Sequence, residues 1–330
     1  MGSYGVNVTA NPVVTVLHAE AKPDEDLLAP VSEHATLRFA DESDLSDALP
    51  GTNVLFAYDF FSHALPDNWL AADSLEWIHI ASAGVERFIF PELRDSGVVV
   101  TNSRGVFDST IAEYVLGQII SFAKDFPGSW RLQQQREWKH RDSQRVGGRT
   151  ALVVGTGPIG RAVARLLTAA GMKVTGSGRR ARENDPDFGT VTAQEDLHDA
   201  LSTADFVVAI APSTPQTHHM FDADAFRAMK STARFINVAR GDLTVTDDLV
   251  SALESGTIAG AALDVTDPEP LPSDHPLWRA PNVLITPHHA GDVIGWRDDL
   301  THLFTRNFQR WMAGKTLLNI VDKERGYVPG

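Results

Sequence analysis

Three glycines in the middle of the chain have the spacing that binds a dinucleotide. Gly155, Gly157 and Gly160 follow the apolar run 151–154, and apolar positions with helical spacing come next. In this strand–turn–helix context the first glycine permits a tight turn, the second lets the backbone approach a pyrophosphate, and the third lets helix and strand pack closely. The free N–H groups at the helix N-terminus then bind phosphate oxygens. The alternative interpretation is a tight turn with a purely structural role.

The segment after the next expected strand bears on the choice of dinucleotide. Sites for NAD place an acidic residue about 20 residues after the glycines, on the ribose 2′-hydroxyl. Here Gly178 stands at that position, and three arginines follow it: Arg179, Arg180 and Arg182. A missing carboxylate removes the repulsion of a 2′-phosphate, which guanidinium groups and Ser177 can bind. We therefore predict NADP(H) as the preferred cofactor and NAD(H) as the second; the alternative is a solvated basic turn.

Alternating strands and helices must carry these residues. In the first hundred residues, short apolar runs predict strands over Val13–Leu17, Asn53–Ala57, Trp77–Ile80 and Val98–Thr101. A second series is expected over Ala151–Gly155, Lys173–Gly176, Phe206–Ile210, Arg234–Val238, Gly260–Val265 and Val283–Thr286. Helical patterns lie between the strands, for example at Asp222–Met229 and Thr246–Glu254. This alternation predicts parallel sheets.

Two longer helical patterns frame the second series. One begins at Ser109, with Asp108 and Ser109 as candidate N-caps, and a polar, tryptophan-bearing segment follows it to Gly148. The other runs from Leu300 to Met312 near the end of the chain and is closed by Gly314. We expect this final helix to return to the domain formed by the first series.

The composition limits the partners of such a chain. Its 330 residues carry a formal net charge of −14, which argues against nucleic acid because phosphate binding needs a basic face. There is no cysteine, which excludes disulfides and cysteine-ligated metals and fits a reducing cytoplasm. No apolar run of about 18 residues predicts a membrane span. The polar segment 1–12 has no signal-peptide pattern, and we expect it to be poorly ordered.

Beyond the glycine motif, several segments resemble the D-isomer-specific 2-hydroxyacid dehydrogenases, in the order and spacing of that family. They are Ser82–Glu86, Thr110–Glu113, Ile236–Gly241, Ala262–Val265, Asp267–Pro272 and Thr286–Gly291. The resemblance covers about residues 81–291 and extends more loosely through the rest. It implies an α/β protein with two Rossmann-like domains and parallel sheets. Residues 1–103 and 292–330 would form a discontinuous, flavodoxin-like substrate-binding domain, and residues 104–291 the NAD(P)-binding Rossmann domain.

The resemblance also implies a catalytic set for reducing a 2-keto acid. Arg240 would bind the carboxylate and carbonyl oxygens, since its fork suits them better than lysine does. His288 would be the acid/base, because the family places this histidine directly after Thr-Pro, which selects it over His289. Glu269 would stabilise and orient the imidazolium. The alternatives are a surface salt bridge for Arg240, a hydrogen-bonded loop histidine and a solvated carboxylate.

Further contacts follow from the same resemblance. Backbone N–H groups of Ala83, Gly84 and Val85 would bind the substrate carboxylate, unless these residues form an ordinary turn. Asp264 would lie near the nicotinamide amide, with a structural cap as its alternative. The remaining cofactor-binding candidates are Gly155, Gly157, Pro158, Ile159, Gly160, Ser177, Arg179, Arg180, Ala211, Pro212, Thr217, Ala239 and His288. No metal ligand is expected, and His289, Trp296 and Arg297 receive no role.

The resemblance thus implies an NAD(P)-dependent oxidoreductase acting on CH–OH groups, similar to glyoxylate/hydroxypyruvate reductases. Hydride would pass from the nicotinamide to a short 2-keto acid, and His288 would supply the proton. We expect a cytoplasmic homodimer that pairs through the helix from Ile111 to Phe122. Two alternatives stay open: a nucleotide-sensing, co-repressor-like protein on the same fold, or a related dehydrogenase for a phosphorylated acid, formate or phosphite. Turnover of a 2-keto acid separates enzyme from sensor.

Overall fold

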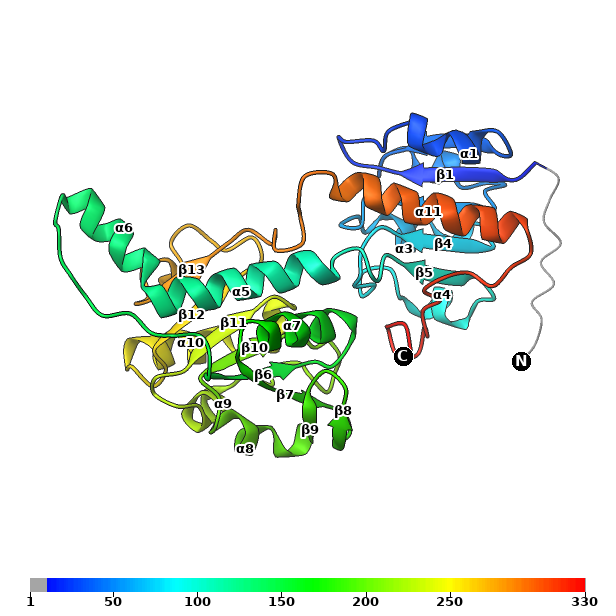
Figure 1. Ribbon diagram of the computed structural model, residues 1–330. Helices are drawn as coiled ribbons and strands as arrows, with labels where there is room; N and C mark the ends of the chain where they lie inside the picture. Colours follow the sequence, from blue (N-terminus) through cyan, green and yellow to red (C-terminus); the bar gives the residue numbers. More distant parts are fainter. Residues whose placement is uncertain (1–10, 330) are drawn as a thin grey trace. The chain divides into compact units, whose positions relative to one another are not determined.

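The computed structural model describes residues 11–329, and its chain divides into two compact units (Figure 1). Unit one comprises Met1–Val106 and Ile294–Gly330, and unit two comprises Phe107–Val293. Each contains a largely parallel sheet with helices packed on it, which confirms the α/β class. The expectations for segment 1–12 fall almost entirely on residues outside the described range. Among residues 11–329, no helix is long and apolar enough to cross a membrane.

A five-stranded parallel sheet forms the centre of unit one, in the order β2-β1-β3-β4-β5. Its strands are β1 (Val13–Leu17), β2 (Thr36–Ala40), β3 (Val54–Ala57), β4 (Trp77–Ile80) and β5 (Val99–Asn102). The inner strands β3 and β4 are buried along their whole length, so continuous apolar runs predicted them. The sequence did not predict β2, because it lies at the sheet edge and buries only Ala40.

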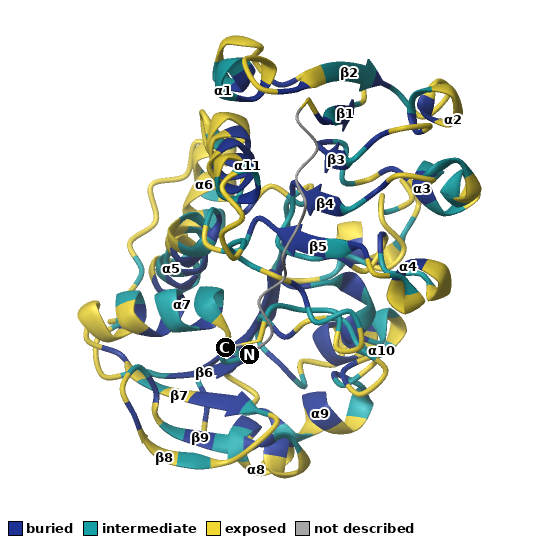
Figure 2. Ribbon diagram, turned by 90° about the vertical axis from the view of Figure 1, so that its right-hand side faces the viewer, coloured by how far each residue is buried: buried dark blue, intermediate teal, exposed yellow. Residues whose placement is uncertain are grey.

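Helices cover both faces of this sheet (Figure 2). On one side lie α1 (Ala29–Ser32) and α11 (Trp296–Met312). On the other side lie α2 (Leu45–Ala48), α3 (Ala64–Asp67) and α4 (Pro91–Asp95). Unit one also contains two short 3-10 turns, η1 (Asp26–Leu28) and η2 (Trp69–Ala71). The helix α11 begins at Trp296 rather than at the predicted Leu300. Its Phe304 stacks on Phe56, with ring centroids 4.1 Å apart, and on Trp77, at 5.5 Å. The C-terminal helix therefore completes the core of unit one.

An eight-stranded sheet forms the centre of unit two, in the order β13-β12-β11-β10-β6-β7-β9-β8. Its strands are β6 (Thr150–Val154), β7 (Lys173–Gly178), β8 (Arg182–Asp185), β9 (Gly189–Ala193), β10 (Phe206–Ala209), β11 (Arg234–Asn237), β12 (Gly260–Leu263) and β13 (Val283–Ile285). All neighbours run parallel except β8, which is antiparallel to β9. The chain adds strands on opposite sides of β6, so the carboxyl ends of β6 and β10 mark the switch point where α/β sheets bind ligands.

Two groups of helices bury the faces of this sheet (Figure 2). On one face, α5 (Asp108–Lys124) and α7 (Pro158–Ala169) pack through Ala112, Val115, Val163 and Leu167 onto the strands. On the other face lie α8 (Leu197–Leu201), α9 (Ala223–Ala228) and α10 (Thr246–Glu254), with the short turns η3 (Gln194–Asp196), η4 (Gly241–Leu243) and η5 (Pro276–Arg279) in the connections. Both cores are apolar, and they hold the carboxyl edge of the sheet in place.

The helical region after Gly105 differs from the sequence prediction at two points. The N-cap of α5 is Phe107, without a capping side chain, so neither Asp108 nor Ser109 is the N-cap. The polar segment after α5 contains a further helix, α6 (Phe126–Gln135), which lies beyond the end of α5 (Figure 1). Its start is set by Asp125, whose side chain accepts the N–H of Gly128 at 3.0 Å. Most of α6 is exposed, so its sequence lacks the apolar pattern that predicts a helix.

Candidate active site

The glycine loop joins β6 to α7 at the carboxyl edge of unit two. Gly155 has φ +116°, and a Cβ there would lie 2.6 Å from the backbone nitrogen of Ala211. A Cβ on Gly160 would lie 2.0 Å from the carbonyl oxygen of Gly155, so only glycine lets α7 approach this closely. Around Gly157 the space is open, and this residue is the N-cap of α7 without a capping side chain. The loop therefore leaves N–H groups at the helix start for a phosphate.

Beside this loop, β7 ends in two residues relevant to the ribose. Ser177 is buried, and its Oγ has no hydrogen-bond partner among the described residues. A Cβ on Gly178 would lie 3.0 Å from Oγ1 of Thr156, which belongs to the glycine loop. The acidic residue typical of NAD sites is thus replaced by a glycine in close contact with the loop.

The three arginines after β7 differ in their surroundings. Arg179 and Arg180 are exposed. Arg182 begins β8, and its Nε donates to Oδ2 of Asp185 at 2.7 Å. Arg182 is therefore held in an ion pair with Asp185, and Arg179 and Arg180 lie in the exposed turn before it.

Loops after β10 and β11 lie at the same edge of the sheet. Ala211 and Ala239 are buried. Thr217 donates its hydroxyl to the carbonyl oxygen of Pro212 at 2.6 Å and accepts the N–H of Thr214 at 2.9 Å, which fixes the turn. These residues surround the switch point between β6 and β10, where a dinucleotide would extend from the glycine loop.

Arg240 follows β11 and is partly buried. Its Nη1 donates to the carbonyl oxygen of Ala239 at 2.8 Å. A Cβ on the next residue, Gly241, would lie 2.0 Å from the carbonyl oxygen of Thr266, so the two segments are in close backbone contact. This contact brings Arg240 toward the loop that carries Glu269, and the Arg240 charge is one of the influences that favour the ionised form of Glu269.

His288 and Glu269 form a hydrogen-bonded pair, with Nδ1 and Oε1 2.7 Å apart. The two side chains are 34% and 36% exposed, so the pair is accessible. Burial alone would raise the pKa of Glu269, but the hydrogen bond and charge of His288, with smaller effects of Thr266 and Arg240, lower it. His288 has φ +52°, a left-handed conformation that is uncommon for residues other than glycine.

Asp264 holds the loop that carries His288. Its buried carboxylate accepts the hydroxyl of Thr286 at 2.6 Å and the N–H groups of His289 and Ala290 at 3.0 and 2.9 Å. The N–H of His288 donates to the backbone carbonyl of Asp264 at 2.8 Å. These bonds match the structural-cap alternative, and the nicotinamide contact of Asp264 stays a proposal.

A tyrosine that sequence reasoning missed extends this network. Tyr114 of α5 places its hydroxyl 2.7 Å from Oγ1 of Thr286, and burial raises its pKa to about 12. The His289 ring lies 6.5 Å from the Tyr114 ring. Nothing in the helical pattern around Tyr114 distinguishes it from a core residue, so the sequence contained no signal for this contact.

The turn with Ala83, Gly84 and Val85 belongs to unit one, whereas Arg240, Glu269 and His288 belong to unit two. The Ala83 carbonyl oxygen accepts a hydrogen bond from Nδ2 of Asn102 at 2.6 Å, and the Ser82 hydroxyl donates to the Gly84 carbonyl oxygen at 2.5 Å. Within residues 11–329, the N–H groups of the three predicted donors have no acceptor. Trp296 and Arg297 also lie in unit one, where the Arg297 guanidinium lies 4.6 Å from the Trp296 ring and 5.7 Å from that of Tyr58.

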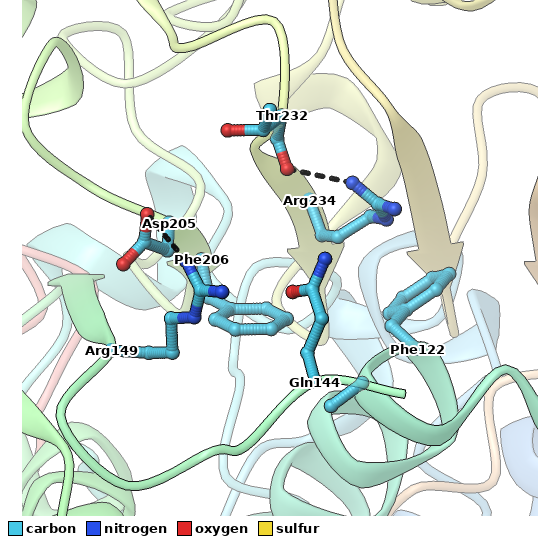
Figure 3. Close-up of a pocket in the computed structure, with 8 residues that line it drawn as sticks. Phe122, Gln144, Arg149, Asp205, Phe206, Thr232 and Arg234 are labelled. Carbon is cyan, nitrogen blue, oxygen red and sulfur yellow. Dashed lines mark hydrogen bonds and ion pairs between the residues drawn. The ribbon is translucent and has the colours of Figure 1, made fainter. Parts of the chain in front are cut away.

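A cavity in unit two lies at the other edge of the sheet, where β6, β10 and β11 begin (Figure 3). Its lining residues are Phe122, Ala123, Gln144, Arg149, Asp205, Phe206, Thr232 and Arg234. Burial lowers the pKa of Arg234, whose Nη1 donates to the carbonyl oxygen of Thr232 at 2.7 Å. None of the predicted site residues lines this cavity, so it is separate from the candidate site. Within residues 11–329, no cluster of three or more His, Asp or Glu residues could hold a metal.

Comparisons with known proteins identify the family of this chain. Residues 116–290 match the family model for "D-isomer specific 2-hydroxyacid dehydrogenase, NAD binding domain". A glyoxylate reductase of Thermofilum pendens is 33% identical over 77% of this chain and 77% of its own. Among solved structures, a D-isomer specific 2-hydroxyacid dehydrogenase family protein from Aeromonas salmonicida has a TM-score of 0.80 and 31% identity, covering 96% of this chain and 100% of its own. An NADPH-dependent glyoxylate/hydroxypyruvate reductase from Sinorhizobium meliloti, in complex with NADP and sulfate, has a TM-score of 0.82 and 26% identity, covering 96% and 100%.

Proposed function

Because the chain belongs to the D-isomer specific 2-hydroxyacid dehydrogenase family, and is thus an NAD(P)-dependent oxidoreductase acting on CH–OH groups, we propose that it reduces a short 2-keto acid with NADPH. The substrate is of the glyoxylate or hydroxypyruvate type. The observation that supports this most strongly is the His288–Glu269 pair at 2.7 Å, on a loop of the unit that carries the glycine motif. In this proposal unit two binds the cofactor and unit one contributes to the substrate site.

The reaction needs a hydride at the carbonyl carbon and a proton at the carbonyl oxygen. The bound nicotinamide supplies the hydride. His288 donates the proton from Nε2, because its Nδ1 faces Oε1 of Glu269. The carboxylate keeps the imidazolium oriented and compensates its charge until the proton leaves. The C=O group thus becomes CH–OH, and His288 regains a proton from solvent.

Arg240 holds the substrate for this transfer. Its guanidinium presents paired N–H donors that fit the carboxylate and the carbonyl oxygen of a 2-keto acid. The unaccepted N–H groups of Ala83, Gly84 and Val85 suit the same carboxylate.

The cofactor preference is argued from the end of β7. At the end of β7, a 2′-phosphate would meet no carboxylate, because Gly178 stands there. It would lie near the buried hydroxyl of Ser177, which has no hydrogen-bond partner among the described residues, and near the exposed Arg179 and Arg180. Guanidinium groups bind phosphate strongly through charge-assisted hydrogen bonds. We expect Arg179→Ala to lower kcat/KM for NADPH by about tenfold and to leave that for NADH within about twofold. Equal losses with both cofactors would remove this role.

The experiment that tests the function is cofactor oxidation, followed by absorbance, with glyoxylate, hydroxypyruvate, pyruvate, phenylpyruvate and 2-ketoisocaproate. Each substrate is assayed with NADPH and with NADH. Turnover that His288→Ala abolishes supports the reductase, and the order of substrates reports the size of the site. Absence of turnover on every acid, with NADPH still bound, would favour a nucleotide sensor instead.

We also propose a homodimer in the cytoplasm. The helix α5 packs inside unit two through Val115 and Ile119, while Leu116, Ile120 and Phe122 stay partly exposed and could pair with a second copy. Three exposed aromatic residues follow α5 in the chain: Phe126 and Trp130 on α6 are 54% and 62% exposed, and Trp138 is fully exposed. Aromatic side chains gathered in this way are typical of interaction surfaces. A monomer mass in light scattering would contradict the dimer.

A further inference from the structure

A cluster of ion pairs ties the β8–β9 hairpin to the helix that begins at the glycine loop. Its centre is Asp185, the last residue of β8, whose side chain is only 2% exposed. Arg161 of α7 binds this carboxylate with two parallel bonds, Nη1–Oδ1 at 2.9 Å and Nη2–Oδ2 at 3.0 Å. Arg182, at the start of β8, adds a third at 2.7 Å. One buried carboxylate therefore joins two segments of unit two.

The same hairpin is held at a second place. Arg161 also donates to Oδ2 of Asp187 at 2.7 Å, and its guanidinium carbon lies 5.5 Å from the centre of the Phe188 ring. Phe188 is 2% exposed and packs in the core beneath β7, close to Gly176. Arg161 directly follows Gly160, the last glycine of the motif. The first turns of α7 and the hairpin are thus one packed assembly.

This assembly fixes both ends of the turn 179–181. Before the turn, β7 pairs with β6 and β9, where Ser177 lies opposite Val154 and Thr192. After it, Arg182 is bound to Asp185. We propose that Asp185 is a positioning residue for cofactor discrimination, which holds the turn so that Arg179 and Arg180 meet the 2′-phosphate of NADPH. The inference rests on the proposed NADPH preference.

Binding energetics explain why such a device is useful. Long arginine side chains on an exposed turn lose conformational entropy when they bind, and a fixed backbone reduces that cost. A buried carboxylate with a bidentate guanidinium and a second arginine gives a stronger anchor than a surface ion pair. The position of a binding group also matters steeply, since a misplacement of about 1 Å can cost about 100-fold.

The alternative role of Arg182 as a direct phosphate ligand makes the opposite prediction. If Arg182 bound the phosphate, Asp185 would compete for it, and removing the charge of Asp185 would improve the use of NADPH. If Asp185 positions the turn, the same change weakens the use of NADPH. The sign of one measurement therefore separates the two roles.

The test compares Asp185→Asn with the parent enzyme in steady-state kinetics with both cofactors. We expect KM for NADPH to rise about tenfold, with kcat and the NADH parameters within about twofold. Asp187→Asn is the matched control, because Asp187 binds Arg161 and Arg165, whereas Arg182 binds Asp185. It should raise KM for NADPH by less than about threefold. Thermal unfolding of each variant shows that it is folded.

Three outcomes would overturn the inference: an unchanged or lower KM for NADPH in Asp185→Asn, equal losses with both cofactors, or the same loss in the Asp187→Asn control. If Asp185→Asn does not fold, Asp185→Ser removes the same charge, and it should likewise raise KM for NADPH selectively. Arg179→Ala, measured in the same series, distinguishes a failure of the NADPH proposal from a failure of the positioning role of Asp185. A parent that prefers NADH overturns the cofactor proposal and this inference together, whereas a selective loss in Arg179→Ala without one in Asp185→Asn overturns the inference alone.

Discussion

Two histidines, one in each unit, have hydrogen-bonded rings in opposite surroundings. His79 of β4 is fully buried, with Nδ1 2.8 Å from the hydroxyl of Thr101, and burial lowers its pKa to about 3. His288 is about one third exposed, with Nδ1 2.7 Å from the carboxylate of Glu269. A hydroxyl cannot compensate an imidazolium, whereas a carboxylate can. The hydrogen-bond partner and the access of solvent, rather than the residue type, therefore decide which histidine can exchange protons with a substrate.

The largest expected effect comes from removing the exposed histidine. His288→Ala should lower kcat/KM for 2-keto acid reduction by about 1,000-fold, the loss typical of a general acid. Because the ring is partly exposed, the free energy of unfolding should change by less than about 1 kcal/mol. Steady-state kinetics and urea unfolding measure both. The adjacent His289→Ala is the control, and a comparable loss there would remove the special role of His288.

A smaller effect is expected from the carboxylate partner. Glu269→Gln keeps the shape of the side chain but not its charge, so kcat should fall by about 30-fold while KM for the cofactor stays unchanged. The lowered pKa of Glu269 gives a pH signature. Its stabilising effect is present above the ordinary value of 4.5 and is lost as the pH falls through the folded value, so the stability difference between parent and variant should shrink there. Identical pH dependence in both proteins would contradict the pairing.

The smallest effect on turnover is expected at the buried histidine, where stability changes instead. The folded state keeps His79 neutral, whereas the unfolded chain binds a proton below its ordinary pKa of 6.5. Stability contributed by neutral His79 is therefore lost as the pH falls from 6.5 toward about 3, at about 1.4 kcal/mol per pH unit. Urea unfolding of the parent and of His79→Gln at several pH values measures this slope. Parallel curves for the two proteins would show that His79 is not the titrating group.

The inner strands could be predicted because burial on both faces leaves a continuous apolar run, as in Trp77–Ile80 of β4. The strands β2 and β8 at sheet edges, and β9 beside β8, could not, because they bury only some of their residues. The helix α6 was missed for the same reason, since its residues are mostly exposed. Periodicity reports burial, and it contains little information where an element lies at the surface.

The site was predictable to a different extent. The glycine loop has a local signature because its geometry requires glycine at Gly155 and Gly160. The contact between Glu269 and His288 has no local signature, and only the family resemblance connected them. The engagement of Arg182 by Asp185 was missed because it depends on a hairpin that the sequence did not predict. Such pairings are made by the tertiary structure, and no local pattern in the sequence predicts them.

The discontinuous course of unit one also has a consequence for synthesis on the ribosome. Unit two is continuous from Phe107 to Val293 and can fold as soon as it emerges. Unit one cannot complete its core before α11 has been synthesised, because Phe304 of α11 stacks on Phe56 and Trp77. Until then the nascent chain exposes two large aromatic rings that the finished protein buries. We therefore expect products that end before Trp296 to aggregate or to be held by chaperones, even with a fully folded nucleotide-binding unit.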